Sequence, residues 1–165
     1  MTRSGGIPLN AVGALVAVML IAAAPDVRAG EITIFASADR PATVWNYGQG
    51  GALSLGLFKL ISLEVEGARS LSEDGDTRMT YFTFGAGLRL PITSITPFAG
   101  MGVGIYYQSQ PGHWQLHTFD SYFAGAKTRI KDLVVLRAEY RYYVLRADPF
   151  RPFESRLSVG AGIAF

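Results

Sequence analysis

The stretch AGMGVGIYY, residues 99–107, alternates strictly between two kinds of side chain. Met101, Val103 and Ile105 stand on one parity, and glycine occupies positions 100, 102 and 104 on the other. Successive side chains of a β-strand point to opposite faces of its sheet, so a period of two predicts a strand with one apolar face. We therefore expect residues 99–107 to lie in a strand whose second face is crowded.

The same period recurs along the chain. It is clear at 53–57, 82–90, 122–126, 136–142 and 157–165, and weaker at 31–39 and 63–71. Since no segment after Gly30 shows a convincing 3.6-residue period, we expect an all-β fold. Eight strands are predicted, at 31–39, 50–58, 63–71, 79–90, 96–107, 116–128, 133–145 and 155–165. Long and short connections alternate between them, which favours an up-and-down antiparallel barrel with its two ends in different compartments.

Composition narrows the function classes. The 165 residues carry 17% charged side chains, 49% hydrophobic ones and a net charge of +2. Such a low and scattered basic charge argues against a nucleic-acid partner. There is no cysteine, which excludes disulfide scaffolds, thiolate zinc sites and cysteine nucleophiles.

The first 29 residues have the pattern of a secretory signal peptide. Arg3 supplies a positive charge, residues 11–24 form an apolar run, and Val27-Arg28-Ala29 ends in a small residue. These are the three regions of a cleavable leader, which would be helical. We expect export with cleavage near Ala29, leaving residues 30–165 as a single barrel domain.

The residues on the two faces of the strands indicate which face of the sheet is turned to a polar environment. The apolar parity of the clearest strands carries no charge, whereas the opposite parity mixes charges with eight glycines. A transmembrane β-barrel turns its apolar face outward, and a small lumen leaves little room for side chains. This pattern favours a transmembrane barrel, with a soluble sandwich or a lipocalin-like barrel as the alternative.

The inward parity then defines a polar network in the lumen. Because buried charges require partners, we expect Glu64, Glu66 and Glu139 to neutralise Arg137, Arg141 and Lys127. Either a plugged structural core or a narrow ion path gated by salt bridges would result. The complete predicted network consists of Glu64, Glu66, Arg89, Lys127, Arg129, Arg137, Glu139, Arg141 and Arg156.

Aromatic residues and arginines gather near the ends of the strands. Rings at the two ends suggest interfacial girdles: Trp45, Tyr47, Tyr106, Tyr107, Trp114, Tyr142 and Tyr143 at the long connections, and Phe58, Phe98 and Phe165 at the short turns. Arginine clasps phosphate bidentately, so five arginines near the long connections are candidate lipopolysaccharide contacts, although cations are also ordinary at a barrel rim. These five are Arg40, Arg69, Arg78, Arg146 and Arg151.

The last two strands resemble a known superfamily. The chain ends in Phe165 after a strand with apolar residues at alternate positions, and residues 136–142, LRAEYRY, resemble a penultimate strand. Both are similar to the small eight-stranded outer-membrane barrels of the OmpA transmembrane-domain, OmpX and opacity-protein kind. The resemblance implies a bacterial outer-membrane location, contact with outer-membrane lipid and lipopolysaccharide, and a salt-bridge gate as one possible use of the lumen. It also implies recognition by the barrel assembly machinery through Tyr140, Tyr142, Leu157, Val159, Ile163 and Phe165.

The sequence predicts no catalytic residue, metal site or cofactor. His113 and His117 are the only histidines, and Asp120 and Ser121 follow them. The His-x-Ser pattern of barrel lipid A deacylases is absent, because Phe119 stands where the serine would be. We expect a non-enzymatic protein with a structural, adhesion or surface-interaction role through four extracellular loops, whose partner the sequence does not identify. The alternatives are a narrow channel, a lipid A-modifying enzyme and a soluble periplasmic ligand-binding barrel.

Overall fold

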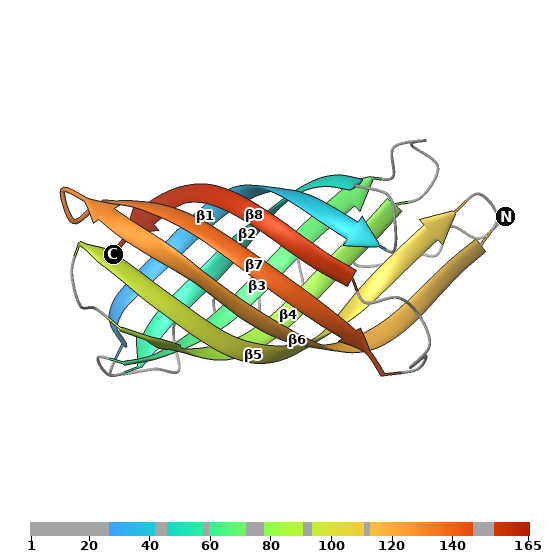
Figure 1. Cartoon of the computed structure of the whole chain (residues 1–165), viewed down its shortest axis with the longest axis horizontal. Helices are drawn as coiled ribbons and strands as arrows, with labels where there is room; N and C mark the ends of the chain where they lie inside the picture. Colours follow the sequence, from blue (N-terminus) through green and yellow to red (C-terminus); the bar gives the residue numbers. More distant parts are fainter. Residues whose placement is uncertain are drawn as a thin grey trace, which may run out of the picture.

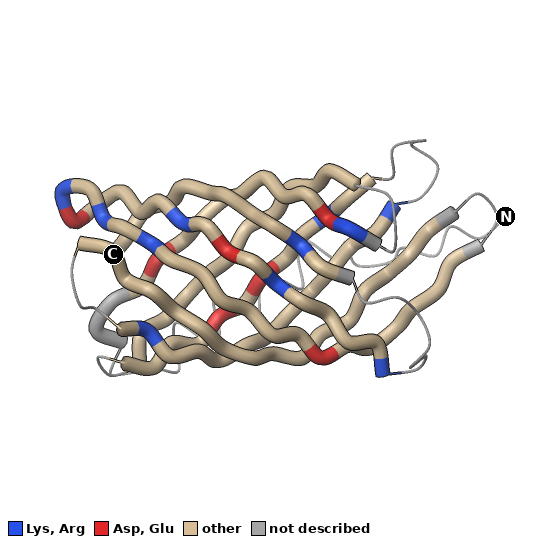
Figure 2. The backbone as a smooth tube through the Cα atoms, viewed as in Figure 1, with Lys and Arg blue, Asp and Glu red and all other residues tan. Residues whose placement is uncertain are grey.

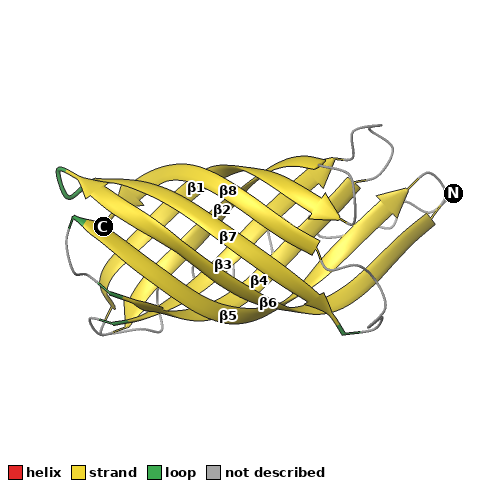
Figure 3. Cartoon of the chain, viewed as in Figure 1, coloured by secondary structure: helices red, strands yellow, loops and turns green. Residues whose placement is uncertain are grey.

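The computed structural model describes residues 27–41, 46–57, 60–71, 78–90, 94–110, 113–146 and 154–165. Every regular element among them is a β-strand (Figure 3). The eight strands are β1 (Val27–Pro41), β2 (Asn46–Leu57), β3 (Ile61–Leu71), β4 (Arg78–Arg89), β5 (Ile95–Gln110), β6 (His113–Ile130), β7 (Val134–Leu145) and β8 (Glu154–Ala164).

Each strand pairs antiparallel with the next, and β1 pairs with β8 to close the ring (Figure 1). The predicted all-β, eight-stranded, antiparallel up-and-down barrel is therefore confirmed. At the long-connection end β2 extends four residues further than predicted, and β5 and β6 extend three residues further each. β6 begins at His113, whereas its neighbour β7 ends at Leu145, opposite Phe119. The β5–β6 hairpin therefore projects beyond β7.

β1 also begins earlier than predicted. Val27 and Ala29 pair with Leu57 and Gly56 of β2, so the strand includes three residues that we assigned to the leader. The rest of the predicted leader, residues 1–26, lies outside the described residues, and cleavage near Ala29 stays a prediction. The described part of the chain contains no helix long and apolar enough to cross a membrane.

The connection between β6 and β7 consists of three residues, 131–133. Lys131 and Asp132 have φ angles of 51° and 58°, and the Leu133 amide donates a 3.3 Å hydrogen bond to the Ile130 carbonyl. Two successive left-handed residues are typical of type I′ hairpin turns, whose twist matches that of the flanking strands. One of the predicted short connections, 129–132, is thereby located at the end of the barrel opposite the projecting hairpin.

The strands turn their apolar parity outward. Met101, Val103 and Ile105 are exposed, as are alternate residues along β4, β7 and β8. Leu53, Leu55 and Val65 share this outward parity but are buried. The inward parity holds buried polar and charged side chains, among them Glu64, Glu66, Arg141 and Arg156. A soluble barrel would show the reverse distribution.

Inward-facing glycines let aromatic rings lie against the wall. A Cβ on Gly100 would stand 2.5 Å from Cζ of Phe123 and 2.7 Å from Cα of Gly87. A Cβ on Gly125 would stand 2.7 Å from Cζ of Phe98. All three distances are shorter than two non-bonded carbon atoms tolerate. The rings therefore occupy space that a side chain at Gly100 or Gly125 would fill.

Gly100→Ala should therefore destabilise the barrel by about 1–3 kcal/mol, because the new methyl group meets backbone atoms that cannot move aside. The matched control is Gly67→Ala, since a Cβ there meets no described atom within 4 Å. Urea unfolding of both variants in detergent would measure the difference. Equal stabilities would show that the inner wall is not as crowded as these distances indicate.

Candidate functional site

The centre of the lumen holds three glutamates and three arginines. Glu64 and Glu66 project from β3, Glu139 from β7, and their partners come from β7 and β8. β3 and β7 lie four strands apart in a ring of eight, so the network joins opposite walls. Figure 2 shows charged residues on the strands in the middle of the barrel as well as at its ends.

Arg141 is the hub of this cluster. Its Nη2 lies 2.6 Å from Oε1 of Glu64 and 3.2 Å from Oε2 of Glu66, and its Nε donates a 2.8 Å hydrogen bond to Glu139. Arg137 lies 2.6 Å from Glu64 and also pairs with Glu139, while Arg156 pairs with Glu66. Three carboxylates thus neutralise three guanidiniums inside a closed sheet.

Lys127 belongs to a second group nearer the short-turn end. The sequence analysis gave it a partner among the three central glutamates, but its Nζ lies 2.5 Å from Oε1 of Glu31 on β1. Arg129, predicted within the lumen, is 37% exposed and lies 3.9 Å from the other oxygen of Glu31. Glu31 was missed, although it shares the inward parity of Thr33 and Ser37 on β1. Arg89, from β4, is half-buried, and its guanidinium lies where a Cβ on Gly56 would stand.

Aromatic rings cover the guanidiniums. The Cζ atoms of Arg137, Arg141 and Arg156 lie 4.6 Å from the centroid of Phe98, 4.5 Å from that of Phe123 and 5.1 Å from that of Phe35. Each stack adds cation–π attraction to the ion pairs. Phe98 was predicted in an interfacial girdle and instead points inward, because the parity of β5 turns it towards the lumen.

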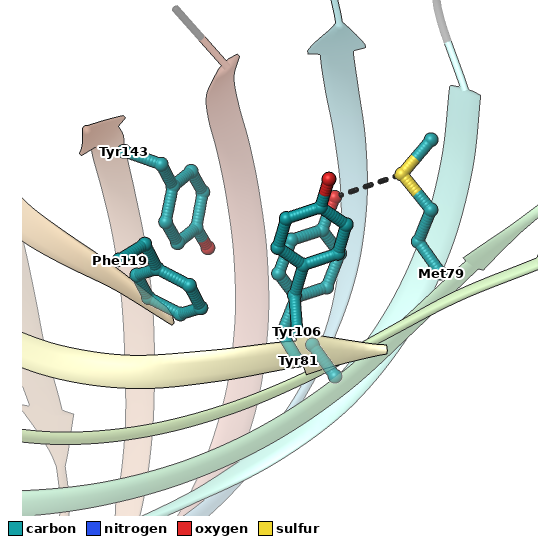
Figure 4. Packing of buried hydrophobic residues seen from close by; sticks show 6 residues of the cluster. Met79, Tyr81, Tyr106, Phe119 and Tyr143 are labelled. Atoms are coloured by element: carbon teal, nitrogen blue, oxygen red, sulfur yellow. Dashed lines mark hydrogen bonds between the residues drawn. The ribbon is translucent and has the colours of Figure 1, made fainter. Parts of the chain in front are cut away.

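An aromatic cluster fills the lumen nearer the long connections (Figure 4). The ring of Tyr81 stacks on those of Tyr106 and Tyr143, with centroids 5.9 and 5.4 Å apart, and Phe119 meets Tyr143 edge-on at 5.0 Å. The Tyr81 hydroxyl donates to Sδ of Met79 at 3.3 Å. Tyr106 and Tyr143 were predicted as girdle residues, and that prediction was wrong because both stand on the inward parity.

Other predicted girdle residues do face outward. Tyr47, Trp114, Tyr107 and Phe165 are exposed, and Tyr142 is half-buried. Trp45 and Phe58 lie outside the described residues. The outer wall therefore keeps part of the predicted aromatic belts, while the lumen holds the remainder.

The three carboxylates at the centre of the described part of the lumen are already engaged by arginines. One carboxylate oxygen each from Glu64, Glu66 and Glu139 lies within 4.8 Å of the others, but the three side chains already accept hydrogen bonds or ion pairs from arginines. A cation there would face three guanidiniums. A cavity of about 10 Å³ adjoins Glu66, Arg137 and Glu139, which is enough for about one water molecule.

The candidate lipopolysaccharide contacts lie on the outer wall. Arg40, Arg69, Arg78 and Arg146 are exposed near the long-connection end, and Arg151 lies outside the described residues. Arg146 follows the last residue of β7 and is held by Asp120 of β6. Contact of these arginines, Arg146 included, with lipopolysaccharide stays a prediction.

The residues considered for catalysis do not converge. The His117 ring stacks on Tyr106 at 5.0 Å and shares a 3.1 Å hydrogen bond with Gln115. Ser121 is buried on the inward parity, whereas Asp120 lies on the outer wall and binds Arg146. An acid and a base on opposite faces of one strand cannot form a hydrogen-bonded triad.

Comparison with solved structures agrees on one architecture. The chain is similar to Neisserial surface protein A, NspA, with a TM-score of 0.66, 12% identity, and 83% of this chain and 96% of that chain covered. It is also similar to the N-terminal β-barrel domain of Pseudomonas aeruginosa OprF, with a TM-score of 0.63 and 15% identity. This comparison covers 82% of this chain and 97% of that chain. A third similar structure is Ail, the attachment invasion locus protein of Yersinia pestis, with a TM-score of 0.56 and 20% identity. This comparison covers 83% of this chain and 98% of that chain. The chain has the fold of the small eight-stranded outer-membrane β-barrels. No protein-family model and no curated sequence matches it.

In this outer-membrane barrel fold the predicted assembly residues occupy the outer surface. Leu157, Val159 and Ile163 of β8 are exposed, as is Tyr140 of β7, while Tyr142 is half-buried. Phe165 follows β8, and its backbone exchanges hydrogen bonds of 2.8 and 2.9 Å with Gly30 at the closing seam. Their role in assembly stays a prediction.

The buried ion pair between Glu31 and Lys127 can be tested by mutation. Lys127→Met should destabilise the fold by about 3–5 kcal/mol, because it leaves a buried carboxylate without its main partner. Adding Glu31→Gln should recover most of that loss, as measured by urea unfolding in detergent.

The matched control combines Lys127→Met with Glu64→Gln. Glu64 pairs with Arg137 and Arg141, so this combination should recover nothing. Recovery through Glu64 but not through Glu31 would contradict the observed pairing.

Proposed function

We propose that the chain is a non-enzymatic bacterial outer-membrane protein with a closed lumen, which acts as a structural, adhesion or surface-interaction protein through four extracellular loops. One observation carries the proposal. Apolar side chains cover the outside of the strands, while ionised groups such as Arg141 and Glu139, each 2% exposed or less, are inside. This distribution is stable when hydrocarbon surrounds the barrel and unfavourable when water does.

The filled lumen favours a surface role over conduction. The charged cluster spans the middle of the barrel, and the aromatic cluster of Tyr81, Tyr106, Phe119 and Tyr143 fills the part nearer the long connections. A lumen of eight strands is just wide enough to be filled by its own side chains. Function is then left to the outer wall and the connections.

The similar structures are consistent with such a role. NspA is named as a surface protein and Ail as an attachment invasion locus protein, and one Ail structure is in complex with the heparin analogue sucrose octasulfate. At 12–20% identity the likeness concerns the fold and does not identify a loop partner for this chain. Export through the leader of residues 1–29 and assembly through the strand ending at Phe165 belong to the same proposal.

Orientation in the membrane can be tested with two matched epitope insertions. An epitope after Gly75, in a long connection, should bind antibody on intact cells, whereas one after Ile92, in a short turn, should do so only after the outer membrane is permeabilised. Both proteins should also show a heat-dependent shift in SDS gels, because a closed barrel stays folded until heated. Labelling of both epitopes in intact cells, or a soluble chain without the shift, would refute the proposal.

Conductance in planar bilayers separates the closed barrel from a gated channel. The wild-type protein should give no sustained current, and Glu64→Gln should not open it, because the arginines and the rings of Phe98 and Phe123 still occupy the lumen. A gate held by salt bridges would instead open when Glu64 loses its charge. Stepwise currents from a variant that retains the heat-dependent shift would favour the channel.

A further inference from the structure

A groove with a volume of about 320 Å³ runs along the outer wall over β4, β5 and β6. The pairing register places Phe82 opposite Ile105, and Ile105 opposite Thr118, in one row across the wall. Phe84 and Val103 form the next row. This volume lies at the lower end of the range for small-molecule sites. The groove is lined by Phe82, Phe84, Val103, Gly104, Ile105, Thr118, Phe119 and Arg146.

Arg146 stands at the border of this groove and is held in place. Its Nε lies 3.1 and 3.0 Å from the two carboxylate oxygens of Asp120, and its Nη2 lies 2.5 Å from Oδ1. Its backbone amide donates to the Thr118 carbonyl at 3.2 Å. The side chain is still 55% exposed, and its Nη1 makes no hydrogen bond with a described residue. A guanidinium has five N–H donors, so donors remain for a further acceptor.

The place of Arg146 along the barrel indicates its depth in a membrane. A lipid-facing arginine costs about 2–4 kcal/mol at the bilayer midplane and about 0–1 kcal/mol near an interface. Arg146 directly follows β7 at the long-connection end, which is the interfacial end of the strand. The apolar rows of the groove extend from there towards the middle of the wall, so a cation at headgroup level adjoins an apolar channel at acyl-chain level.

We propose that this groove binds one lipid A moiety of lipopolysaccharide. An acyl chain lies along Phe82, Phe84, Val103 and Ile105, and Arg146 donates hydrogen bonds to a lipid A phosphate. This inference rests on the proposed outer-membrane location, since the long-connection end then faces the leaflet that contains lipopolysaccharide. Asp120 acts as a positioning residue, because it keeps the guanidinium beside the groove.

The test uses purified bis-phosphorylated lipid A and the full-length barrel refolded in detergent, with binding followed by native mass spectrometry. Wild type should bind one lipid A per barrel. Arg146→Gln should weaken that binding at least tenfold, because the phosphate loses its charged donors. Thr118→Phe should also weaken it at least tenfold without changing any charge, because the new ring fills the groove.

Lys131→Gln is the matched control. Lys131 is exposed in the short turn between β6 and β7 and does not line the groove, so the loss of its charge should change lipid A binding less than twofold. An equal loss of binding in Lys131→Gln, or wild-type binding by Thr118→Phe, would overturn the groove and leave general attraction to exposed cations. Binding of phosphatidylglycerol as tightly as lipid A would overturn the assignment to lipopolysaccharide.

The heat-dependent gel shift separates this proposal from the function on which it rests. If the variants keep the heat-dependent shift but all bind lipid A equally well, the lipid A site in the groove is wrong and the outer-membrane barrel stands. A wild-type chain without the shift contradicts the outer-membrane barrel itself.

Discussion

The pairing of Arg141 with three carboxylates, in the middle of a closed sheet, is the constraint on which the rest of the structure depends. An ion buried without a partner costs several kcal/mol, so every charge that enters the lumen must be matched inside it. Glu64 and Glu66 reach Arg141 from the opposite wall, and their separation therefore ties the width of the barrel to the length of these side chains. The opposite parity of these strands is mainly apolar and forms the outer wall.

The aromatic rings and the glycines follow from the same confinement. Phe98 and Phe123 stack on guanidiniums, and each ring has room because its partner on the neighbouring strand is a glycine, Gly125 for Phe98 and Gly100 for Phe123. A methyl group at either glycine would meet both a ring and backbone atoms. The alternating glycines of residues 99–107 are therefore the complement, on β5, of rings that project from β6.

Strand number and facing followed from the sequence because both depend on local parity, and strand order followed from the alternation of long and short connections. Pairing across the lumen did not, because it depends on the stagger of strands distant in sequence. Lys127 meets Glu31, 96 residues away, rather than Glu139 of the adjacent strand. The prediction of the aromatic girdles was wrong in part for a different reason. Tyr106 and Tyr107 are equally suited to a membrane interface, and only their opposite parities place Tyr106 in the lumen. Parity was available in the sequence and would have separated them, whereas the partner of Lys127 was not.

The closed lumen proposed above leaves specific recognition to surfaces that the lumen does not constrain. Inside, charge and volume must both balance, so one change affects several neighbours of Arg141. In the proposed membrane location, the hydrocarbon around the outer wall requires only apolar side chains, so a charged residue there needs its own explanation. Asp120 and Arg146 form such a pair on this wall, at the point where β6 continues past the end of β7. The last described hydrogen bond between β6 and the chain that follows β7 joins the Arg146 amide to the Thr118 carbonyl, so a fixed cation stands where this ladder ends. A recognition site can therefore arise where the closed ladder becomes uneven.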